Sequence, residues 1–403
     1  MRIPNLWRAG LNLIGVRLRR FQRHGRTASH VVQRVEKKAR HSGEALLHAP
    51  ALASARMQRG RGALERGRKR LVRFDDHVLA PYRTERQVKR VLARGASSQR
   101  PIVVGPWTSE VGYEALYWLP FVRWAADRYR VSPDRMIALS RGGTASWYSG
   151  IAGSYVEIFD LIDPDEFAIE AAARRSAGDQ KQMARSEFDE RLVRAASRQL
   201  GVSNVAVWHP GLMYQLFRAF WHGDRSLEFF FRHADFRYSS VATPSHDMSL
   251  PPDYVAVKFY TGPALPDTAG NRALLRDVVA QIAERVPVVM LDTAWTTDEH
   301  RDYAFDGIGG VTTIRPSLDP RTNLGVQTQV IAGARQFVGT CGGLAWLAPF
   351  LGVDTLAIYE DDRYLTAHLY AARYAYRKSG SARFSALNIS ALRNMGVALA
   401  HAS

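Results

Sequence analysis

The stretch that decides the fold is FVGTCGGLAWLAPFLG, residues 337–352. An apolar run ends at Gly339, a glycine-rich turn follows, and a helix of small and apolar residues begins at about Gly343. A second apolar run, 355–359, predicts another strand. Proline, glycine and aspartate divide the apolar stretch 342–359 where a strand–helix–strand unit would turn, so this stretch does not predict a membrane span.

Strands and helices alternate in the same way through most of the chain. Apolar runs predict strands at 101–105, 136–139, 155–159, 205–208, 254–259, 286–291, 311–314 and 336–339. Helical patterns lie between them, among them 164–200, 271–285 and 323–334. This alternation indicates parallel sheets covered by helices. The pattern restarts after 239–252, so we expect an α/β protein with two Rossmann-like domains, 96–248 and 249–403, that face a cleft.

The first 95 residues predict a basic helical extension. Residues 1–100 hold 25 of the 55 Lys and Arg but only 6 of the 38 Asp and Glu, a net charge of +19, which leaves −2 for the remainder. Apolar side chains at helical spacing form one face, at Ile3, Trp7, Leu11, Ile14, Leu18 and Phe21. Such a helix favours an anionic membrane surface, here through residues 1–40, with packing on the body as the alternative. Nucleic acid is less favoured, because no aromatic residues interleave with the arginines of 56–73.

Composition narrows the class of protein. With 46% hydrophobic and 23% charged residues the chain is an ordinary globular protein, which excludes wholesale disorder. The single cysteine, Cys341, cannot form an intrachain disulfide and fits a reducing compartment. The N-terminal stretch lacks the apolar core and cleavage site of a signal peptide. We therefore expect a cytoplasmic protein, peripheral to the inner face of the membrane.

The turn at 340–343 is the strongest candidate for a ligand site. Glycines allow phosphates to approach the backbone, and the free N–H groups of a first helical turn bind them. Thr340, Gly342 and Gly343 are therefore candidate phosphate contacts, to which Thr340 adds a hydroxyl. The alternative is that these small residues only let helix and strand pack closely.

This arrangement resembles a known family. A strand, a Gly-rich turn, a helix rich in Leu and Ala, Gly-Val and a strand ending in Tyr are similar to the donor-side signature of GT-B glycosyltransferases, the heptosyltransferase-like members above all. The resemblance is clearest over 325–360 and implies two Rossmann-like domains, the C-terminal one binding a nucleotide-sugar, usually without a metal. The turn Thr-Cys-Gly-Gly departs from the Ser/Asp-Gly and following His typical of heptosyltransferases.

A candidate catalytic loop follows the first predicted strand, at 105–114. It lies at the carboxyl end of that strand, where open α/β sheets form ligand crevices. In the family that the chain resembles, an N-terminal carboxylate or histidine removes the proton from the acceptor hydroxyl. Glu110 is the candidate base, with Glu114 as the alternative; a dry cleft would raise the pKa of such a base toward neutrality. Otherwise Glu110 is a first-turn carboxylate favoured by the helix dipole.

A cluster that begins with Lys258 and Thr261 is a candidate donor contact. Lys258 interrupts an apolar strand, where an unpaired ammonium is costly to bury, so it requires either a diphosphate or a neighbouring carboxylate. Arg272 begins the next helix and would share the phosphate or only solvate the surface.

Other candidates would contact the rest of the donor. Asn323 and Gln327 lie one helical turn apart and would contact the ribose or base, unless Asn323 caps its helix. Glu360, after the last predicted strand, would hold sugar hydroxyls or belong to a solvated acidic turn.

Several sites are disfavoured by the sequence. The twelve histidines show no HxxxH or HExxH spacing and no CxxC pair exists, so no metal site is predicted. The chain also lacks a P-loop, a GxGxxG and a GxSxG motif, which disfavours kinases, dehydrogenases and α/β-hydrolases. His209 and the aromatic residues between 214 and 231 are interpreted as structural; the alternatives are that His209 lines the cleft and that the aromatic residues form an apolar groove for the acceptor.

The predicted function is that of a metal-independent glycosyltransferase without a cofactor, moving a sugar from a nucleotide-sugar to a glycan or lipid-linked acceptor at the membrane surface. Two alternatives remain open. One is a sugar-nucleotide epimerase or pyruvyl transferase on the same scaffold. The other is a non-catalytic scaffold that binds a membrane or nucleic acid.

Overall fold

The computed structural model describes residues 79–178, 181–237, 248–293, 300–363, 365–380 and 382–390. Residues 77–403 make up one compact unit. The stretch 1–40, on which the membrane prediction rests, lies outside the described residues. In the part of the chain that is described, no helix is both long and apolar enough to cross a membrane.

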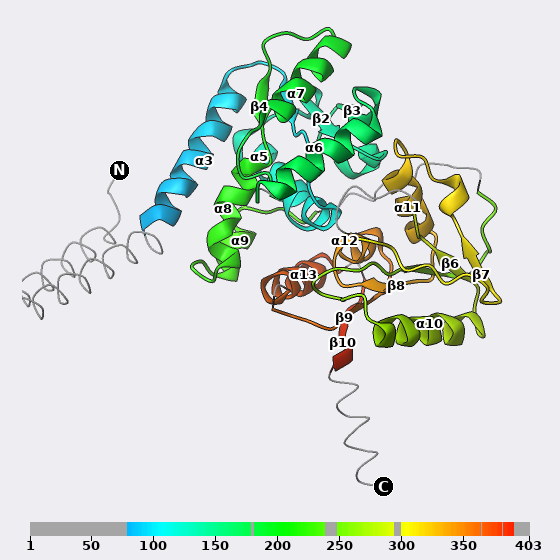
Figure 1. Ribbon diagram of the computed structural model, residues 1–403. Coiled ribbons are helices and arrows are strands. Elements are labelled where there is room, and N and C mark those ends of the chain that lie inside the picture. Colours follow the sequence, from blue (N-terminus) through cyan, green and yellow to red (C-terminus); the bar gives the residue numbers. More distant parts are fainter. Residues whose placement is uncertain are drawn as a thin grey trace, which may run out of the picture. The chain divides into compact units, whose positions relative to one another are not determined.

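Four parallel strands form the first sheet, in the order β3-β2-β1-β4. Their bounds are Ile102–Val104 (β1), Met136–Ser140 (β2), Ser154–Glu157 (β3) and Ala206–Trp208 (β4). The helices of this half are grouped around the sheet in Figure 1: α3 (Ala80–Ser97), α4 (Val111–Tyr113), α5 (Leu119–Tyr129), α6 (Pro164–Ser176), α7 (Glu187–Gln199), α8 (Gly211–Trp221) and α9 (Leu227–Phe231). A π-helical turn, Glu114–Trp118, joins α4 to α5.

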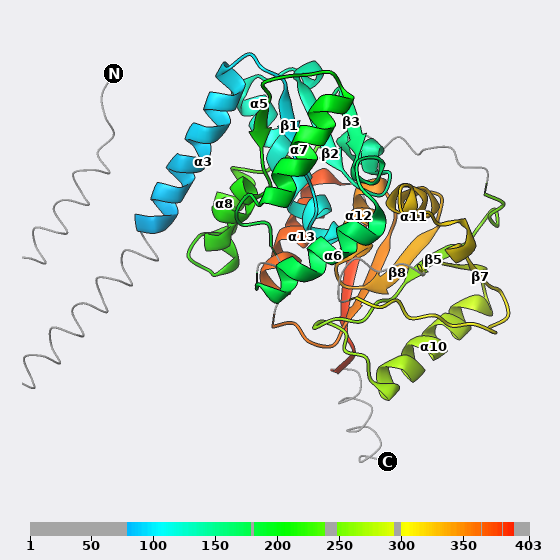
Figure 2. The same cartoon turned by 45° about the horizontal axis from the view of Figure 1, so that its top comes forward.

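Six parallel strands form the second sheet, in the order β10-β9-β8-β5-β6-β7. Their bounds are Val255–Lys258 (β5), Val288–Met290 (β6), Val311–Thr313 (β7), Gln336–Thr340 (β8), Thr355–Tyr359 (β9) and Phe384–Asn388 (β10). Figure 2 labels its helices, which are α10 (Ala269–Ala283), α11 (Asn323–Ala332), α12 (Gly343–Leu347) and α13 (Thr366–Ser379). Two wholly parallel sheets confirm the predicted α/β class.

Local chemistry explains where the helices begin and end. Asp163 caps α6 and Pro164 occupies its first position, while Ser186 and Asp189 form a capping box at the start of α7. The predicted helical run 164–200 is therefore two helices, because Gly178 in the left-handed region ends the first. The loop between them carries Lys181 to the wall of a cavity.

The main hydrophobic core extends through both sheets. Fully or almost fully buried side chains such as Trp118 and Phe217 from the first half share it with Phe337 and Leu347 from the second. The aromatic side chains Tyr214, Phe217, Phe220, Phe229 and Phe230 are buried, which confirms their interpretation as core.

Helix α3 also belongs to this core, through Val88, Leu92 and Ala96. Most of α3 falls within the predicted extension 1–95, so the compact body takes in residues that the charge pattern groups with the basic extension. The division of the body at residue 249 stays a prediction.

Buried polar contacts join the two halves near the carboxyl ends of their strands. The backbone N–H of Gly325, on α11, donates to the carbonyl of Gly142, after β2, at 2.8 Å. The indole N–H of Trp147 donates to the hydroxyl of Thr328 at 2.9 Å. These contacts place the segment after β2 against the second half of the body.

Candidate functional site

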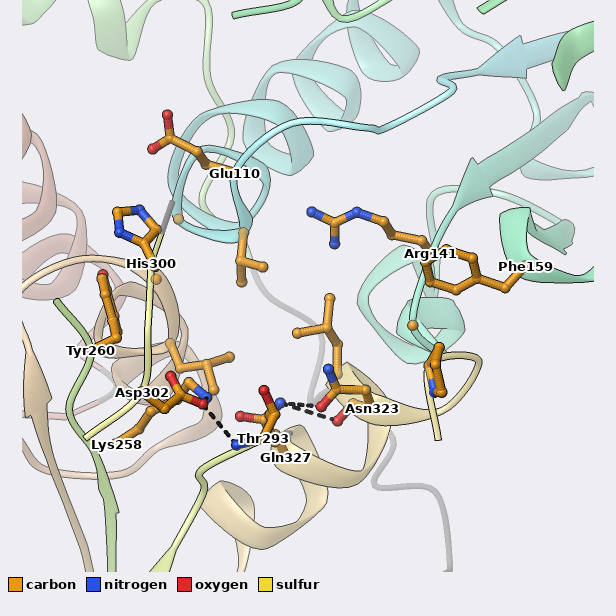
Figure 3. A pocket seen from close by; sticks show the side chains of 17 residues that line it. Glu110, Arg141, Phe159, Lys258, Tyr260, Thr293, His300, Asp302, Asn323 and Gln327 are labelled. Atoms are coloured by element: carbon orange, nitrogen blue, oxygen red, sulfur yellow. Dashed lines mark hydrogen bonds and ion pairs between the residues drawn. The ribbon is translucent and has the colours of Figure 1, made fainter. Parts of the chain in front are cut away.

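Two adjoining cavities lie between the loops of the two sheets. The larger has a volume of about 810 Å³ and the smaller, shown in Figure 3, about 130 Å³. Both are lined by Glu110, Gly112, Arg141, Tyr260, His300 and Gly343. The cavities therefore meet where the loop after β1 faces the turn after β8, at the sheet edges where parallel α/β folds bind ligands.

Glu110 directly precedes α4, and its side chain does not cap that helix. Figure 3 shows it on the loop after β1, with Tyr260 and His300 coming from the second half of the body. The loop itself is held from behind by Gln182. This buried amide accepts from the N–H of Thr108 at 3.0 Å and donates to the carbonyl of Pro106 at 3.0 Å. Glu110 is thus a carboxylate on a fixed loop that lines both cavities.

Glu114, the alternative base, is fully buried and lines neither cavity. One of its oxygens accepts from Ser140 Oγ and Tyr148 OH, each at 2.7 Å. Burial raises the pKa of this carboxyl to about 7, although the two hydroxyls oppose the shift. Glu110 is therefore the better placed of the two to meet a substrate.

Arg141 lines both cavities and is not among the site residues predicted from the sequence. It lies at the end of β2 with only 6% of its surface exposed. Its guanidinium donates to the carbonyl of Ser109 at 2.7 Å and reaches toward the middle of the site in Figure 3. Within the described residues, no carboxylate forms an ion pair with it. A signal for it exists in the sequence: an Arg-Gly-Gly directly after a strand, at the sheet edge that carries Glu110.

The turn that carries Arg141 is fixed by a buried carboxylate. Gly142 and Gly143 both adopt left-handed backbone conformations, which glycine tolerates. Their N–H groups donate to the carboxylate of Glu157, at 3.0 and 2.8 Å. Burial raises the pKa of Glu157, and these bonds oppose that shift.

Cations predominate in the larger cavity. Five line it (Arg141, Arg174, Arg175, Lys181 and Arg363), against the carboxylates of Glu110 and Asp361. Arg363 is paired with Asp361. Arg174 donates to Thr108 Oγ1 at 2.7 Å. The lining is therefore positively charged, most of all on the side of the first sheet.

Lys181 and His368 complete the wall of the larger cavity. The Lys181 ammonium donates to Tyr113 OH at 2.8 Å and lies 4.7 Å from the centre of the Tyr113 ring. Burial lowers its pKa, and Glu110 opposes that shift. His368 contacts Tyr117 OH at 2.5 Å and Tyr113 OH at 3.2 Å, and burial lowers its pKa to about 3, so its imidazole is neutral.

The candidate phosphate turn lines the larger cavity. Thr340 Oγ1 donates to the carbonyl of Tyr260 at 3.0 Å and accepts from its N–H at 2.8 Å, so it ties the end of β8 to the end of β5. A Cβ at Gly342 would lie 2.4 Å from Tyr260 OH, and this glycine has a φ of +141°. The turn is therefore closely packed, as the alternative to phosphate binding predicted. The same turn also lines the larger cavity.

The smaller cavity contains three further predicted residues: Lys258, Asn323 and Gln327. Of the two partners expected for the Lys258 ammonium, a diphosphate or a carboxylate, the structure contains the carboxylate: Asp302 lies 2.8 Å away. Gln327 Nε2 donates to Asn323 Oδ1 at 2.5 Å. Gln327 is 1% exposed and, within the part of the chain that is described, its Oε1 has no hydrogen-bond partner.

The remaining predicted residues line neither cavity. Thr261 Oγ1 accepts from the N–H of Arg301 at 3.1 Å. Arg272 pairs with Asp267 at 2.6 Å and is exposed, and Glu360 accepts from Asn271 Nδ2 at 2.7 Å. The structure therefore brings together Glu110, Lys258, Asn323, Gln327, Thr340, Gly342 and Gly343, and leaves Thr261, Arg272 and Glu360 in structural or solvated contacts. Over the described ranges, no group of three or more His, Cys, Asp or Glu side chains gathers as a metal site would require.

Comparisons with known proteins give distant likenesses. No protein-family model matches the chain, and no curated protein matches it. A similar solved structure is the dodecameric iron-containing heptosyltransferase TibC in complex with ADP-D-β-D-heptose, at 12% identity and a TM-score of 0.35, over 65% of this chain and 58% of that one. The chain thus spans less than two thirds of the length of TibC.

Two further structures cover more of their own length. E. coli heptosyltransferase WaaC with ADP is 13% identical, with a TM-score of 0.34, over 73% of this chain and 98% of that one. A putative UDP-N-acetylglucosamine 2-epimerase from Listeria monocytogenes is 12% identical, with a TM-score of 0.32, over 75% and 88%. At these identities and TM-scores the likenesses assign neither an activity nor a substrate.

Proposed function

We propose that the protein is a glycosyltransferase that moves a sugar from a nucleotide-sugar to a hydroxyl of a glycan or lipid-linked acceptor, with Glu110 as general base. One observation carries the proposal. A carboxylate on a fixed loop lines both cavities, and it shares the larger one with a glycine turn of the other sheet and five cations. Base, backbone amides and positive charge are the groups that transfer from a diphosphate leaving group requires.

The proposed step assigns a role to each side of the site. The acceptor oxygen attacks the anomeric carbon while the Glu110 carboxylate takes the proton of that hydroxyl. The bond between the anomeric carbon and the phosphate oxygen breaks, and its electron pair leaves with the nucleoside diphosphate. The turn at Gly342 and Gly343 then faces the charge that develops on the leaving phosphate. The proposal uses no metal and no cofactor.

Nucleotide binding is the direct test of this function. The full chain would be unfolded by heat in the presence of UDP, GDP, ADP, dTDP and CMP, each with and without EDTA. A ligand present at 100 times its dissociation constant stabilises the folded state by about 2.7 kcal/mol, a readily measured shift. We expect one nucleotide to stabilise the chain, with no effect of EDTA. A flat panel at millimolar concentrations would contradict the proposal.

The donor sugar separates this proposal from an epimerase on the same scaffold. With the matching nucleotide-sugar, a transferase releases nucleoside diphosphate in proportion to an added acceptor. An epimerase converts the sugar with no acceptor present. Product analysis by mass spectrometry and NMR would distinguish the two.

A further inference from the structure

The cations of the larger cavity are not spread evenly around it. Four of the five come from the first half: Arg141 directly follows β2, Arg174 and Arg175 lie on α6, and Lys181 lies in the loop between α6 and α7. These four side chains are the cationic wall. The second half contributes Arg363, which is already paired with Asp361.

Two members of the wall are buried or half-buried and form no ion pair with a described carboxylate, although the charge of Glu110 acts on Lys181. Arg141 is 6% exposed, its hydrogen bond goes to a backbone carbonyl, and its Nε has no partner within the described residues. Lys181 contacts the hydroxyl and ring of Tyr113 and the ring of Trp221, 5.3 Å away, and forms no ion pair with any described carboxylate. Burying a cation is costly unless an anion accompanies it. A bound anion would supply that balance.

The wall is built onto the loop that carries the proposed base. Arg174 donates to the hydroxyl of Thr108, and Arg141 donates to the carbonyl of Ser109. Thr108 and Ser109 are the two residues before Glu110. Whatever gives its proton to Glu110 therefore lies beside the wall, while the turn at Gly342 and Gly343 belongs to the other sheet.

We propose that the acceptor carries an anionic group, a phosphate or a carboxylate, which the cationic wall binds while the acceptor hydroxyl faces Glu110. This inference rests on the proposed function and names the chemical class of the acceptor. The wall then orients the acceptor, since a charge-assisted contact at one end of the molecule fixes which hydroxyl meets the base.

The test uses three small sugars as probes of the wall. The full chain would first be saturated with the nucleoside diphosphate that stabilises it, so that the donor turn is occupied. Glucose 6-phosphate, glucuronate and glucose would then be titrated in, and binding followed by ligand-observed NMR. The first two differ from glucose by a phosphate and a carboxylate, so they also show which anion the wall prefers.

Matched variants locate the binding. Lys181→Met removes the charge and keeps most of the side chain's length; Lys89→Met, at a half-exposed lysine of α3 outside both cavities, is its control. We expect an anionic sugar to bind at least tenfold more tightly than glucose. Lys181→Met should remove about tenfold of that preference. It should change the affinity for the nucleoside diphosphate by less than twofold, and Lys89→Met should change neither affinity.

Each other outcome overturns the inference in a different way. Equal binding of all three sugars means that the wall recognises no anion. If Lys181→Met weakens the nucleoside diphosphate as much as the sugar phosphate, the wall serves the donor, and the proposed function stands without this acceptor. If no nucleoside diphosphate binds the unmodified chain, the proposed function fails and the acceptor class fails with it. Binding of glucose 6-phosphate that still depends on Lys181 would then identify an anion site of another function.

Discussion

At the scale of single residues, Glu110 owes its position to Gln182, whose amide bonds the backbone on the N-terminal side of it. If this carboxylate is the base, Glu110→Gln keeps the size of the side chain and removes its ability to take a proton. We expect kcat to fall by about 10²- to 10⁴-fold with nucleotide binding and thermal stability unchanged. Steady-state kinetics with the donor from the nucleotide panel would measure this, with Glu170→Gln, outside both cavities, as the control. An unchanged kcat would remove Glu110 from the mechanism.

A change at Arg141 should affect catalysis and stability differently. Arg141→Gln removes a buried cation that has no carboxylate partner within the described residues, so the lost bond to Ser109 is offset by the lost cost of burying the charge. We expect kcat/KM to fall about a hundredfold while the free energy of unfolding changes by less than about 1 kcal/mol.

Kinetics and urea denaturation on the same preparation test this pair of values. The control is Arg128→Gln, an exposed arginine outside both cavities. A large loss of stability with unchanged kinetics would make Arg141 a structural residue.

The buried carboxyl of Glu114 makes stability depend on pH. Its pKa is raised from 4.5 to about 7 in the folded protein, so the folded state holds this proton more tightly than the unfolded chain. The stability that the proton contributes is therefore complete below about pH 4.5 and is lost as the pH rises to about 7. The loss amounts to about 3 kcal/mol for a shift of this size.

Glu114→Gln should abolish this dependence, because an amide keeps an oxygen for Ser140 and Tyr148 and does not titrate. We expect the variant to gain about 3 kcal/mol relative to the unmodified chain between about pH 5 and pH 8, measured by urea denaturation. The contributions of other titrating groups are the same in both proteins, so they cancel in the difference between the two free energies of unfolding. A difference that stays constant over this range would show that Glu114 keeps an ordinary pKa.

Residue types and their positions at strand ends are enough to predict part of the site. Glu110, Lys258 and the turn 340–343 follow or end predicted strands, and the carboxyl ends of parallel strands share one sheet edge. Lys181 and His368 could not be found in that way. They come from a loop and a helix whose place at the cavity depends on packing between distant segments.

At the scale of elements, the turn between β8 and α12 depends on Gly342. A Cβ at this position would meet the hydroxyl of Tyr260 at 2.4 Å, and its backbone lies in a region that other residues rarely adopt. Gly342→Ala should therefore destabilise the protein by about 2 to 4 kcal/mol. Gly352→Ala has positive φ but open space around it, so it isolates the cost of the backbone alone.

Tyr260→Phe should rescue part of this loss, because it removes the oxygen that the new methyl group meets while the ring carbon is 3.7 Å away. A double-mutant cycle by urea denaturation would give a coupling energy of about 1 kcal/mol or more. If the two changes are additive, the hydroxyl is not what excludes a side chain at residue 342.

The sequence predicted most elements because buried parallel strands are continuous apolar runs. It missed β10, whose residues are half-exposed at the edge of the sheet, and α13, whose polar outer face obscures its buried positions. It also joined α6 and α7 into one helical run, since both are rich in charged helix formers and only Gly178 marks the break. These are the places where tertiary contacts, rather than local pattern, decide the structure.

At the scale of the whole molecule, charge divides a basic N-terminal quarter from a nearly neutral remainder. If residues 1–40 bind an anionic surface, the full chain should sediment with vesicles of about 30% phosphatidylserine and not with phosphatidylcholine alone. Each Arg near the surface contributes about 1 kcal/mol. Replacing Arg17, Arg19 and Arg20 by Gln should therefore weaken binding about a hundredfold, and salt should do the same.

A matched triple change on the body is the control for vesicle binding: Arg128→Gln, Arg198→Gln and Arg218→Gln. These exposed arginines lie outside the stretch 1–40 and both cavities. Equal loss of binding in both triple variants would show that the attraction follows total charge, and the extension would then have no special role.

The turn after β2 has a consequence for the molecule as a whole. Glu157 holds it from the first half, and the N–H of Gly325 on α11 holds it from the second. The observed position of Arg141 therefore depends on the hydrogen bonds from both halves. The two halves are thus joined beside Arg141, which lines both cavities. If the two halves separate to admit or release a substrate, the Arg141 guanidinium moves away from the site. The site would then be complete only in the closed arrangement.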